Sequence, residues 1–193
     1  MPHDDIEFAS LCAMRQRFVM ISGCSGGGKS ALLAALAARG FAVETEPGPQ
    51  IVREQLFIGG DALPWIDPRA FIDLVVSRAM HQLTRAGARG RLTLFDRGLV
   101  DAFAWFGRNG LAVPAPIQQA VTRLRYAETV FMAPPWREIF VEDAERRHGF
   151  ADAEAEYRSL CEAYAGLGYR IVMLPKTSVG DRADFVAKQI GSA

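Results

Sequence analysis

Residues 23–30 decide the fold, because they read Gly23-Cys24-Ser25-Gly26-Gly27-Gly28-Lys29-Ser30. The stretch fits the pattern Gly-x-x-x-x-Gly-Lys-Ser/Thr at every fixed position. Glycines let successive backbone N–H groups point into one anion-sized hollow, and the helix that follows adds its positive end. In such a loop Lys29 reaches the outer phosphates of a nucleotide and the Ser30 hydroxyl binds Mg²⁺. A plain glycine-rich turn has no need of a lysine and a serine at the helix start, so the eight residues predict a phosphate-binding loop.

The segments on either side of the loop predict alternating strands and helices. Apolar runs at residues 18–21, 41–46, 92–95, 129–132 and 169–174 are typical of buried strands. Helices are expected at residues 31–39, 50–57, 69–85, 99–106, 117–125, 136–147, 152–165 and 178–190. Pro47-Gly48-Pro49 is expected to break the chain, and Asp67 to cap the next helix with Pro68 at its first position. The pattern predicts an α/β fold, a doubly wound five-stranded parallel sheet that binds ligands at the strands' C-terminal ends.

Length and charge restrict the domain organisation and the partners. With 193 residues, the chain fits one domain at residues 17–193, preceded by an arm or short helix at residues 1–16. Lysine plus arginine and aspartate plus glutamate each total 22, and this zero net charge gives no support for nucleic-acid or membrane binding. Three scattered cysteines form neither a disulfide framework nor a metal motif. The acidic start MPHDDIEF is unlike a signal peptide, so we expect a cytoplasmic protein.

The segment Asp96-Arg97 closes the third predicted strand beside the phosphate loop. There Asp96 is expected to hold Mg²⁺ together with Ser30 or to face the reacting phosphate; the alternative is a helix-capping aspartate. Motor-type ATPases usually place a glutamate after this aspartate to activate water, and here that position is Arg97. An arginine cannot act as a base, but it can bind a phosphate or orient a substrate. The pair therefore favours transfer of phosphate to a bound acceptor over fast hydrolysis.

Further candidates lie around the expected acceptor site. Strand alternation puts Glu44 and Glu46 on the same side, with Glu46 nearer the end of the strand. A carboxylate that faces the γ-phosphate can accept a proton from a substrate hydroxyl, so Glu46 is the candidate base, whereas Glu44 is expected to be solvated. The alternative is that both glutamates are solvated. A polar acceptor needs polar contacts, for which Arg78 and Asp101 are the candidates.

Several segments in order resemble one family. They are the phosphate loop, the Glu46 segment, Trp-Ile-Asp-Pro at 65–68, Phe-Asp-Arg-Gly at 95–98 and Gly-Tyr-Arg-Ile-Val-Met-Leu-Pro at 168–175. Together they resemble the predicted-ATPase family, an AAA-type domain related to the nicotinamide-riboside kinase regulator domain. The resemblance implies a nucleoside-kinase-like P-loop fold.

Two short segments are also similar to the glutamate-proline and acidic-Arg-Ser signatures of deoxynucleoside kinases. Glu46-Pro47 and Asp96-Arg97-Gly98 carry this similarity, which implies that Glu46 is the general base and that Arg97 lies beside the phosphates. Two positions depart from the related sequences. Gly98 replaces their serine, and Pro49 stands where they often carry an arginine, so one anion-binding group is absent.

Residues 136–147 follow the fourth predicted strand, where nucleoside and nucleotide kinases carry a lid. Asp143-x-x-Arg146 resembles the lid segment of the riboside kinase relatives, which implies that Arg146 neutralises charge during transfer. Arg137 and Arg147 are the further lid candidates for nucleotide binding. The alternative is a solvated helix whose charges pair with one another, as Asp143 and Arg147 could at i,i+4.

The resemblance also implies a nucleotide-base site after the fifth strand. There Ser178 and Val179 match a loop that packs on the adenine in related kinases, and Arg182 matches a position near the base. The alternatives are that Ser178 only caps the final helix and that Asp181 and Arg182 form a surface pair.

Three functions are open at this point. The first is a kinase that passes the γ-phosphate of ATP·Mg²⁺ to a small, nucleoside-like hydroxyl acceptor, with Lys29, Glu46, Asp96, Arg97 and Arg146 in the catalytic site. The second is an ATP or GTP hydrolase or nucleotide-dependent switch. The third is a nucleotide-binding module without turnover. The arginine after Asp96 favours the first function over the second.

Overall fold

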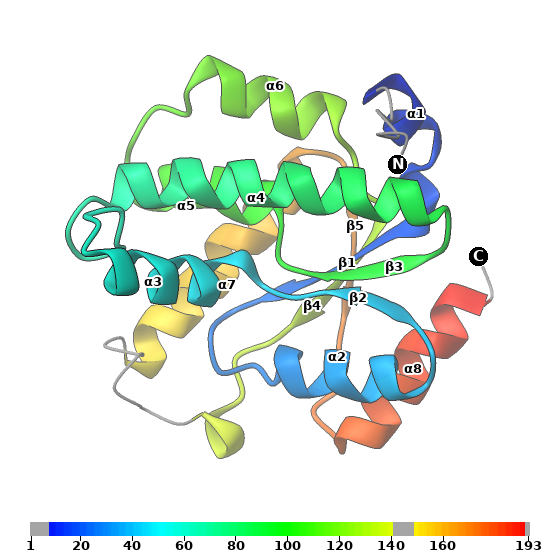
Figure 1. The fold of residues 1–193 in the computed structure, drawn as a ribbon. Coiled ribbons are helices and arrows are strands. Elements are labelled where there is room, and N and C mark those ends of the chain that lie inside the picture. Colours follow the sequence, from blue (N-terminus) through cyan, green and yellow to red (C-terminus); the bar gives the residue numbers. More distant parts are fainter. Residues whose placement is uncertain (1–7, 141–148, 192–193) are drawn as a thin grey trace.

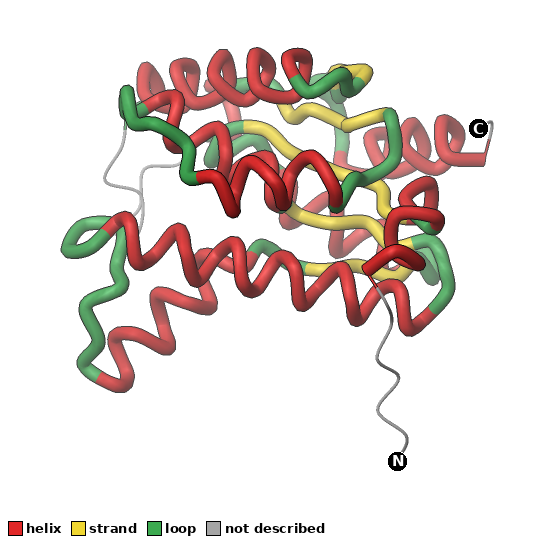
Figure 2. The backbone as a smooth tube through the Cα atoms, turned by 90° about the horizontal axis from the view of Figure 1, so that it is seen from above, coloured by secondary structure: helices red, strands yellow, loops and turns green. Residues whose placement is uncertain are grey.

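A five-stranded, all-parallel sheet forms the centre of the computed structural model, which describes residues 8–140 and 149–191. The strands are β1 (Phe18–Gly23), β2 (Ala42–Glu44), β3 (Thr93–Asp96), β4 (Thr129–Ala133) and β5 (Arg170–Met173), in the order β2-β3-β1-β4-β5. Figure 2 shows the strands as an inner layer between helices. The five predicted strands and the α/β class are thus confirmed.

Helices cover both faces of the sheet (Figure 1). One face packs against α1 (Phe8–Ala13), α4 (Pro68–Arg89), α5 (Leu99–Arg108), α6 (Ala115–Arg123) and α7 (Phe150–Gly166). The other face packs against α2 (Lys29–Ala38) and α8 (Val179–Gly191), while α3 (Pro47–Ile58) lies on α4. Because β1 is buried on both faces, Phe18 and Met20 enter one core and Val19 and Ile21 enter the other. Within the residues described, no helix is long and apolar enough to cross a bilayer.

Local sequence signals explain several element ends. Asp67 Oδ1 accepts a hydrogen bond of 2.9 Å from the Ala70 N–H, and Pro68 begins α4, as predicted. The segment Pro47-Gly48-Pro49 does not break the chain, because α3 begins at Pro47. The first N–H groups of a helix have no partner within it, so proline is tolerated there. Short 3-10 helices lie at Arg15–Arg17 and Arg137–Ile139.

The predicted helix at 136–147 is described only in part. Residues 137–139 form the second 3-10 helix rather than an α-helix, and residues 141–148 lie outside the described residues. The predictions for Asp143, Arg146 and Arg147 therefore fall outside the structure. The arm at 1–16 includes α1, whose Leu11 is buried in the core against α4.

Candidate active site

The phosphate loop connects β1 to α2 at the C-terminal edge of the sheet. Gly23 has φ +133°, and a Cβ there would lie 2.2 Å from the Ala133 carbonyl oxygen on β4. Gly28 has φ +75°, in the left-handed region, and immediately precedes α2. These two positions require glycine, one for close approach to a neighbouring strand and both for their backbone conformation. The loop is therefore fixed in a curled path by its sequence.

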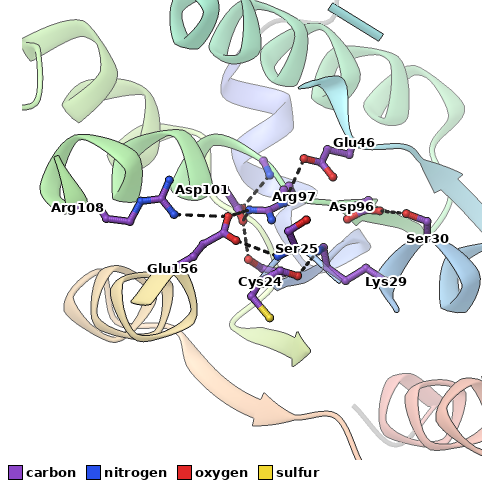
Figure 3. A network of polar contacts seen from close by, with 12 residues as sticks. Cys24, Ser25, Lys29, Ser30, Glu46, Asp96, Arg97, Asp101, Arg108 and Glu156 are labelled. Atoms are coloured by element: carbon purple, nitrogen blue, oxygen red, sulfur yellow. Dashed lines mark hydrogen bonds and ion pairs between the residues drawn. The ribbon is translucent and has the colours of Figure 1, made fainter. Parts of the chain in front are cut away.

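A lysine, a serine and an aspartate meet at this loop (Figure 3). Lys29 is buried, and its Nζ donates a hydrogen bond of 2.9 Å to the Cys24 carbonyl. Asp96 ends β3 opposite Ile21 of β1, and its Oδ2 accepts a hydrogen bond of 3.4 Å from Ser30 Oγ. Its other oxygen, Oδ1, is buried and has no hydrogen-bond partner among the described residues.

Burial raises the pKa of Asp96 from 3.8 to about 6; the Lys29 charge counters the rise and the Glu46 charge adds to it. A buried carboxylate oxygen without a partner, next to a serine hydroxyl, fits a hard cation that takes oxygen ligands. The residues present thus fit Mg²⁺, which Ser30 and Asp96 would hold.

Arg97 adopts an unusual backbone conformation, with φ +59°, the only positive φ outside glycine among the described residues. Its side chain is 14% exposed and faces three carboxylates. The Nε atom lies 3.2 Å from Glu46 Oε1, while Nη1 lies 2.8 Å from Glu156 Oε1 and 3.7 Å from Asp101 Oδ1. A left-handed non-glycine residue carries strain and persists where its surroundings hold it. Here three ion pairs hold it.

Glu46 lies between β2 and α3, at the N-cap position of α3. Its carboxylate is 32% exposed and forms an ion pair with Arg97, whose Nε makes no hydrogen bond among the described residues. The preceding carbonyl, of Thr45, accepts a hydrogen bond of 2.8 Å from Gln82 on α4. The backbone next to Glu46 is therefore held in place by α4, while the Glu46 carboxylate stays accessible at the mouth of the site.

The expectation that Glu44 is solvated is wrong, since it is 1% exposed. Its carboxylate is bound by Arg85 and by Arg89, whose Nη1 lies 2.6 Å away. Both arginines come from the last two turns of α4, more than forty residues along the chain. Buried carboxylates need such partners, so Glu44 joins β2 to α4 rather than contributing to the site.

The two proposed acceptor residues lie in different surroundings. Asp101 is buried behind Arg97 and accepts hydrogen bonds from Ser22 Oγ (2.6 Å), Tyr164 Oη (2.8 Å) and the Gly98 N–H (3.0 Å). Arg78 pairs with Glu54 of α3 at 2.9 Å and lines a polar cavity of about 220 Å³ between α3 and α4. In this geometry Asp101 supports Arg97, and a contact of either residue with an acceptor remains a prediction.

The departure at Gly98 has a steric cause. A Cβ there would lie 2.3 Å from Tyr126 Oη and 2.7 Å from Met20 Cε. That hydroxyl accepts a hydrogen bond from the Leu99 N–H at 3.3 Å, so it occupies the space beside the start of α5. The serine of the deoxynucleoside kinase signature has no room at this position.

The segment after β4 lies against the phosphate loop. A Cβ at Gly26 would be 2.6 Å from the Phe140 ring, and one at Gly28 would be 3.1 Å from Ile139 Cδ1. Arg137 stacks over the Phe150 ring, 4.2 Å from its centroid. Residues 137–140 thus lie next to the loop on which the nucleotide phosphates are predicted to bind.

The predicted base-side residues are split between a cap and a buried arginine. Ser178 Oγ accepts a hydrogen bond of 3.2 Å from the Asp181 N–H and donates one of 2.7 Å to its carboxylate, so it caps α8, which begins at Val179. Arg182 does not form a surface pair, because it is 1% exposed. Its Nη2 donates a hydrogen bond of 3.0 Å to the Gly27 carbonyl oxygen. Its buried Nε has no hydrogen-bond partner within the described ranges.

Sequence reasoning missed Glu156 on α7. Its Oε2 accepts a hydrogen bond of 2.9 Å from the Ser25 N–H, and its Oε1 binds Arg97. The sequence offers no signal for it, because Glu156 is one acidic residue among several in residues 152–162. Only the packing of α7 against α5 directs this carboxylate at the phosphate loop.

Comparison with known proteins identifies the family and the fold. A family model described as an AAA domain matches residues 18–182. No curated protein gives a significant match. Similar solved structures include thymidylate kinase from Ehrlichia chaffeensis, with 16% identity and a TM-score of 0.55, covering 90% of this chain and 97% of that one.

Two further structures have the same fold. Shikimate kinase from Acinetobacter baumannii in complex with shikimate has 15% identity and a TM-score of 0.56, covering 91% of this chain and 93% of that one. NadR protein in complex with NR has 15% identity and a TM-score of 0.62, and 91% of this chain matches 53% of that one. At these identities the likeness shows a shared P-loop kinase fold.

Proposed function

The chain belongs to the AAA domain family of P-loop proteins, and from this premise we propose that it is an ATP- and Mg²⁺-dependent small-molecule kinase. The proposal rests on one observation above all, the ion pair between Arg97 and Glu46 beside the phosphate loop. Arg97 takes the place at which hydrolysing ATPases carry a water-activating glutamate. The carboxylate that reaches the mouth of the site comes instead from Glu46, between β2 and α3.

The donor nucleotide is assigned to the phosphate loop. Backbone N–H groups of residues 26–30 and the Lys29 ammonium neutralise the outer phosphates, and Ser30 and Asp96 hold Mg²⁺. When bound, the metal supplies charge neutralisation at the phosphates. Arg182, buried against Gly27, and the Ser178–Val179 segment are the base-side candidates, with Arg137, Arg146 and Arg147 as lid candidates.

Transfer requires that the acceptor hydroxyl lose a proton as its oxygen bonds to the γ-phosphorus. Glu46 accepts that proton, and the bond between the γ-phosphorus and the bridging oxygen of ADP breaks. Arg97 orients the Glu46 carboxylate, and Asp101 supports Arg97 from behind. ADP and the phosphorylated acceptor leave, and Glu46 returns its proton to solvent.

The test measures ADP release with and without a panel of nucleosides and sugar alcohols. We expect slow release without acceptor and a severalfold increase with a suitable one. Glu46→Gln should retain ATP binding but slow acceptor-dependent release by about 10²–10⁴, as for loss of a general base. Glu128→Gln, at a 70% exposed side chain that pairs with Arg15 at the surface, is the matched control.

Two outcomes would contradict this assignment. Acceptor-dependent release at the parent rate in Glu46→Gln would remove Glu46 as the base. Rapid ADP release that no acceptor increases would favour a hydrolase, because water would then be the phosphate acceptor.

A further inference from the structure

One carboxylate lies between the phosphate loop and two arginines (Figure 3). Glu156 Oε2 accepts the Ser25 N–H at 2.9 Å. Its Oε1 lies 2.8 Å from Arg97 Nη1 and 3.8 Å from Arg108 Nη1. A backbone N–H and two guanidinium groups would otherwise form a site for an anion from a ligand. In this protein the chain fills that site with its own negative charge.

The position of Glu156 is fixed by contacts between α7 and α5. Tyr164 Oη, near the C-terminal end of α7, donates a hydrogen bond of 2.8 Å to the Asp101 carboxylate on α5. Between Glu156 and Tyr164 along α7, Ser159 Oγ lies 3.4 Å from the Ala104 carbonyl oxygen of α5. The Glu156 side chain is only 17% exposed. Its carboxylate is therefore a built part of the site and not a mobile surface group.

Glu156 also stays ionised under ordinary conditions. Although burial raises the pKa, the Arg97 guanidinium and the Ser25 N–H bring the pKa of the Glu156 carboxyl down to about 2. Its negative charge therefore persists throughout the pH range in which enzymes of this class work.

The neighbouring arginines have carboxylate partners as well. Arg97 contacts three carboxylates, those of Glu46, Asp101 and Glu156. Towards the α3–α4 side, Arg78 pairs with Glu54, and Arg85 and Arg89 pair with Glu44. A phosphorylated ligand is recognised by guanidinium groups that are free to bind its oxygens. Each of these arginines already has at least one carboxylate partner.

Building on the proposed function, we propose that Glu156 is a specificity-determining residue that excludes phosphorylated acceptors and selects neutral or cationic hydroxyl compounds. A phosphate placed against Arg97 would meet the Glu156 carboxylate at close range, and the like charges would repel. A hydroxyl group meets no such penalty, because it can donate a hydrogen bond to a carboxylate.

The experiment compares Glu156→Gln with the parent protein and with Glu162→Gln, an exposed glutamate on the same helix. The probes are adenosine, guanosine, cytidine, uridine and thymidine, each with its 5′-monophosphate, and inorganic phosphate as a probe without a base. Binding is measured by calorimetry with the donor site saturated by a non-hydrolysable ATP analogue and Mg²⁺. Turnover of the nucleosides is measured in parallel as ADP release.

In Glu156→Gln we expect inorganic phosphate and the monophosphates to bind at least about tenfold more tightly than in the parent, since Arg97 and Arg108 lose the carboxylate that they share. Nucleoside KM should change much less, so the preference between the paired probes shifts towards the monophosphate. A second change, Arg108→Gln in the Glu156→Gln background, should remove part of the gain. Glu162→Gln should behave like the parent.

The inference is overturned if the parent binds the monophosphates more tightly than the nucleosides, or if Glu156→Gln leaves the phosphate affinity unchanged. If Glu156 had only a structural role, its replacement would weaken the binding of all probes together and leave the ratio of their affinities constant. That result would also contradict the proposal. Failure of the kinase assignment looks different, because it is the absence of acceptor-dependent ADP release in the parent, whatever the phosphate affinity of the variant.

Discussion

Replacement of Asp96 by asparagine removes a charge that the folded protein stabilises poorly. Burial raises the pKa of this carboxyl from 3.8 to about 6. That difference corresponds to about 3 kcal/mol between its ionised and neutral forms in the folded state. Asparagine resembles the neutral form in shape, and it keeps an oxygen or amide group that can bond to Ser30. Asp96→Asn should therefore be more stable than the parent at neutral pH.

The raised pKa of Asp96 also determines how the stability difference between the parent and Asp96→Asn changes with pH. Because the folded-state pKa is raised, the stability that the protonated carboxyl provides is complete below pH 3.8 and is lost as pH rises through about 6. The advantage of Asp96→Asn should thus be small near pH 4, about half of its full value near pH 5 and complete, on the order of 3 kcal/mol, at pH 7. For a domain of this size, 3 kcal/mol raises Tm by about 6–12 °C.

The assay is urea unfolding of both proteins from pH 4 to pH 8 without nucleotide, and Tm with ATP in the presence of Mg²⁺ or EDTA. The parent should gain stability from Mg²⁺ together with ATP, and Asp96→Asn should lose that gain. Asp73→Asn, which removes an exposed carboxylate paired with Arg69, should change stability by less than about 1 kcal/mol. A variant that is less stable than the parent at pH 7 would refute the electrostatic argument, and an undiminished Mg²⁺ effect would refute the metal site.

Two further variants test the loop and the steric fit at the start of α5. Lys29→Ala should abolish turnover and weaken ATP affinity, because it removes the buried ammonium of the phosphate loop; calorimetric titration with ATP and Mg²⁺ checks this, with Lys188→Ala in the last turn of α8 as control. Gly98→Ser should destabilise the fold by about 1–3 kcal/mol in urea unfolding, because its Cβ would lie 2.3 Å from Tyr126 Oη. Tyr126→Phe should relieve part of that cost, and an equal loss in both backgrounds would contradict the clash.

The sequence predicts those parts of the fold and site that depend on local patterns. Apolar runs identify all five strands, and the glycines with Lys29 and Ser30 identify the loop, because each needs only neighbouring residues. The position of Asp96 at the end of β3 is predicted for the same reason, since it directly follows an apolar run. Its hydrogen bond with Ser30 follows from the adjacency of β1 and β3 in a parallel sheet.

Residues whose environment comes from distant helices are not predictable in this way. The burial of Glu44 depends on Arg85 and Arg89, which α4 brings back over β2. Arg182 is buried because α8 returns beneath the phosphate loop. Glu156 reaches Ser25 across 131 positions of the chain, and no spacing rule connects them. The predicted chain break at residues 47–49 is wrong for a simpler reason. Proline ends some helices and begins others, and here it begins α3.

Arg97 connects the donor and acceptor halves of the site. It follows Asp96 directly, so the residue proposed to hold the metal and the residue that orients Glu46 share one turn of the chain. Its left-handed backbone carries strain on the order of 1 kcal/mol or more, which the three carboxylates offset. Glycine would relieve that strain but would leave Glu46, Asp101 and Glu156 without their common cation, in a site where Asp96 already ionises with difficulty. An arginine in a strained conformation at this position is thus explained by the charges around it. Among the described residues, the Arg97 guanidinium already faces these three carboxylates, so under our proposal it binds a phosphorylated acceptor poorly.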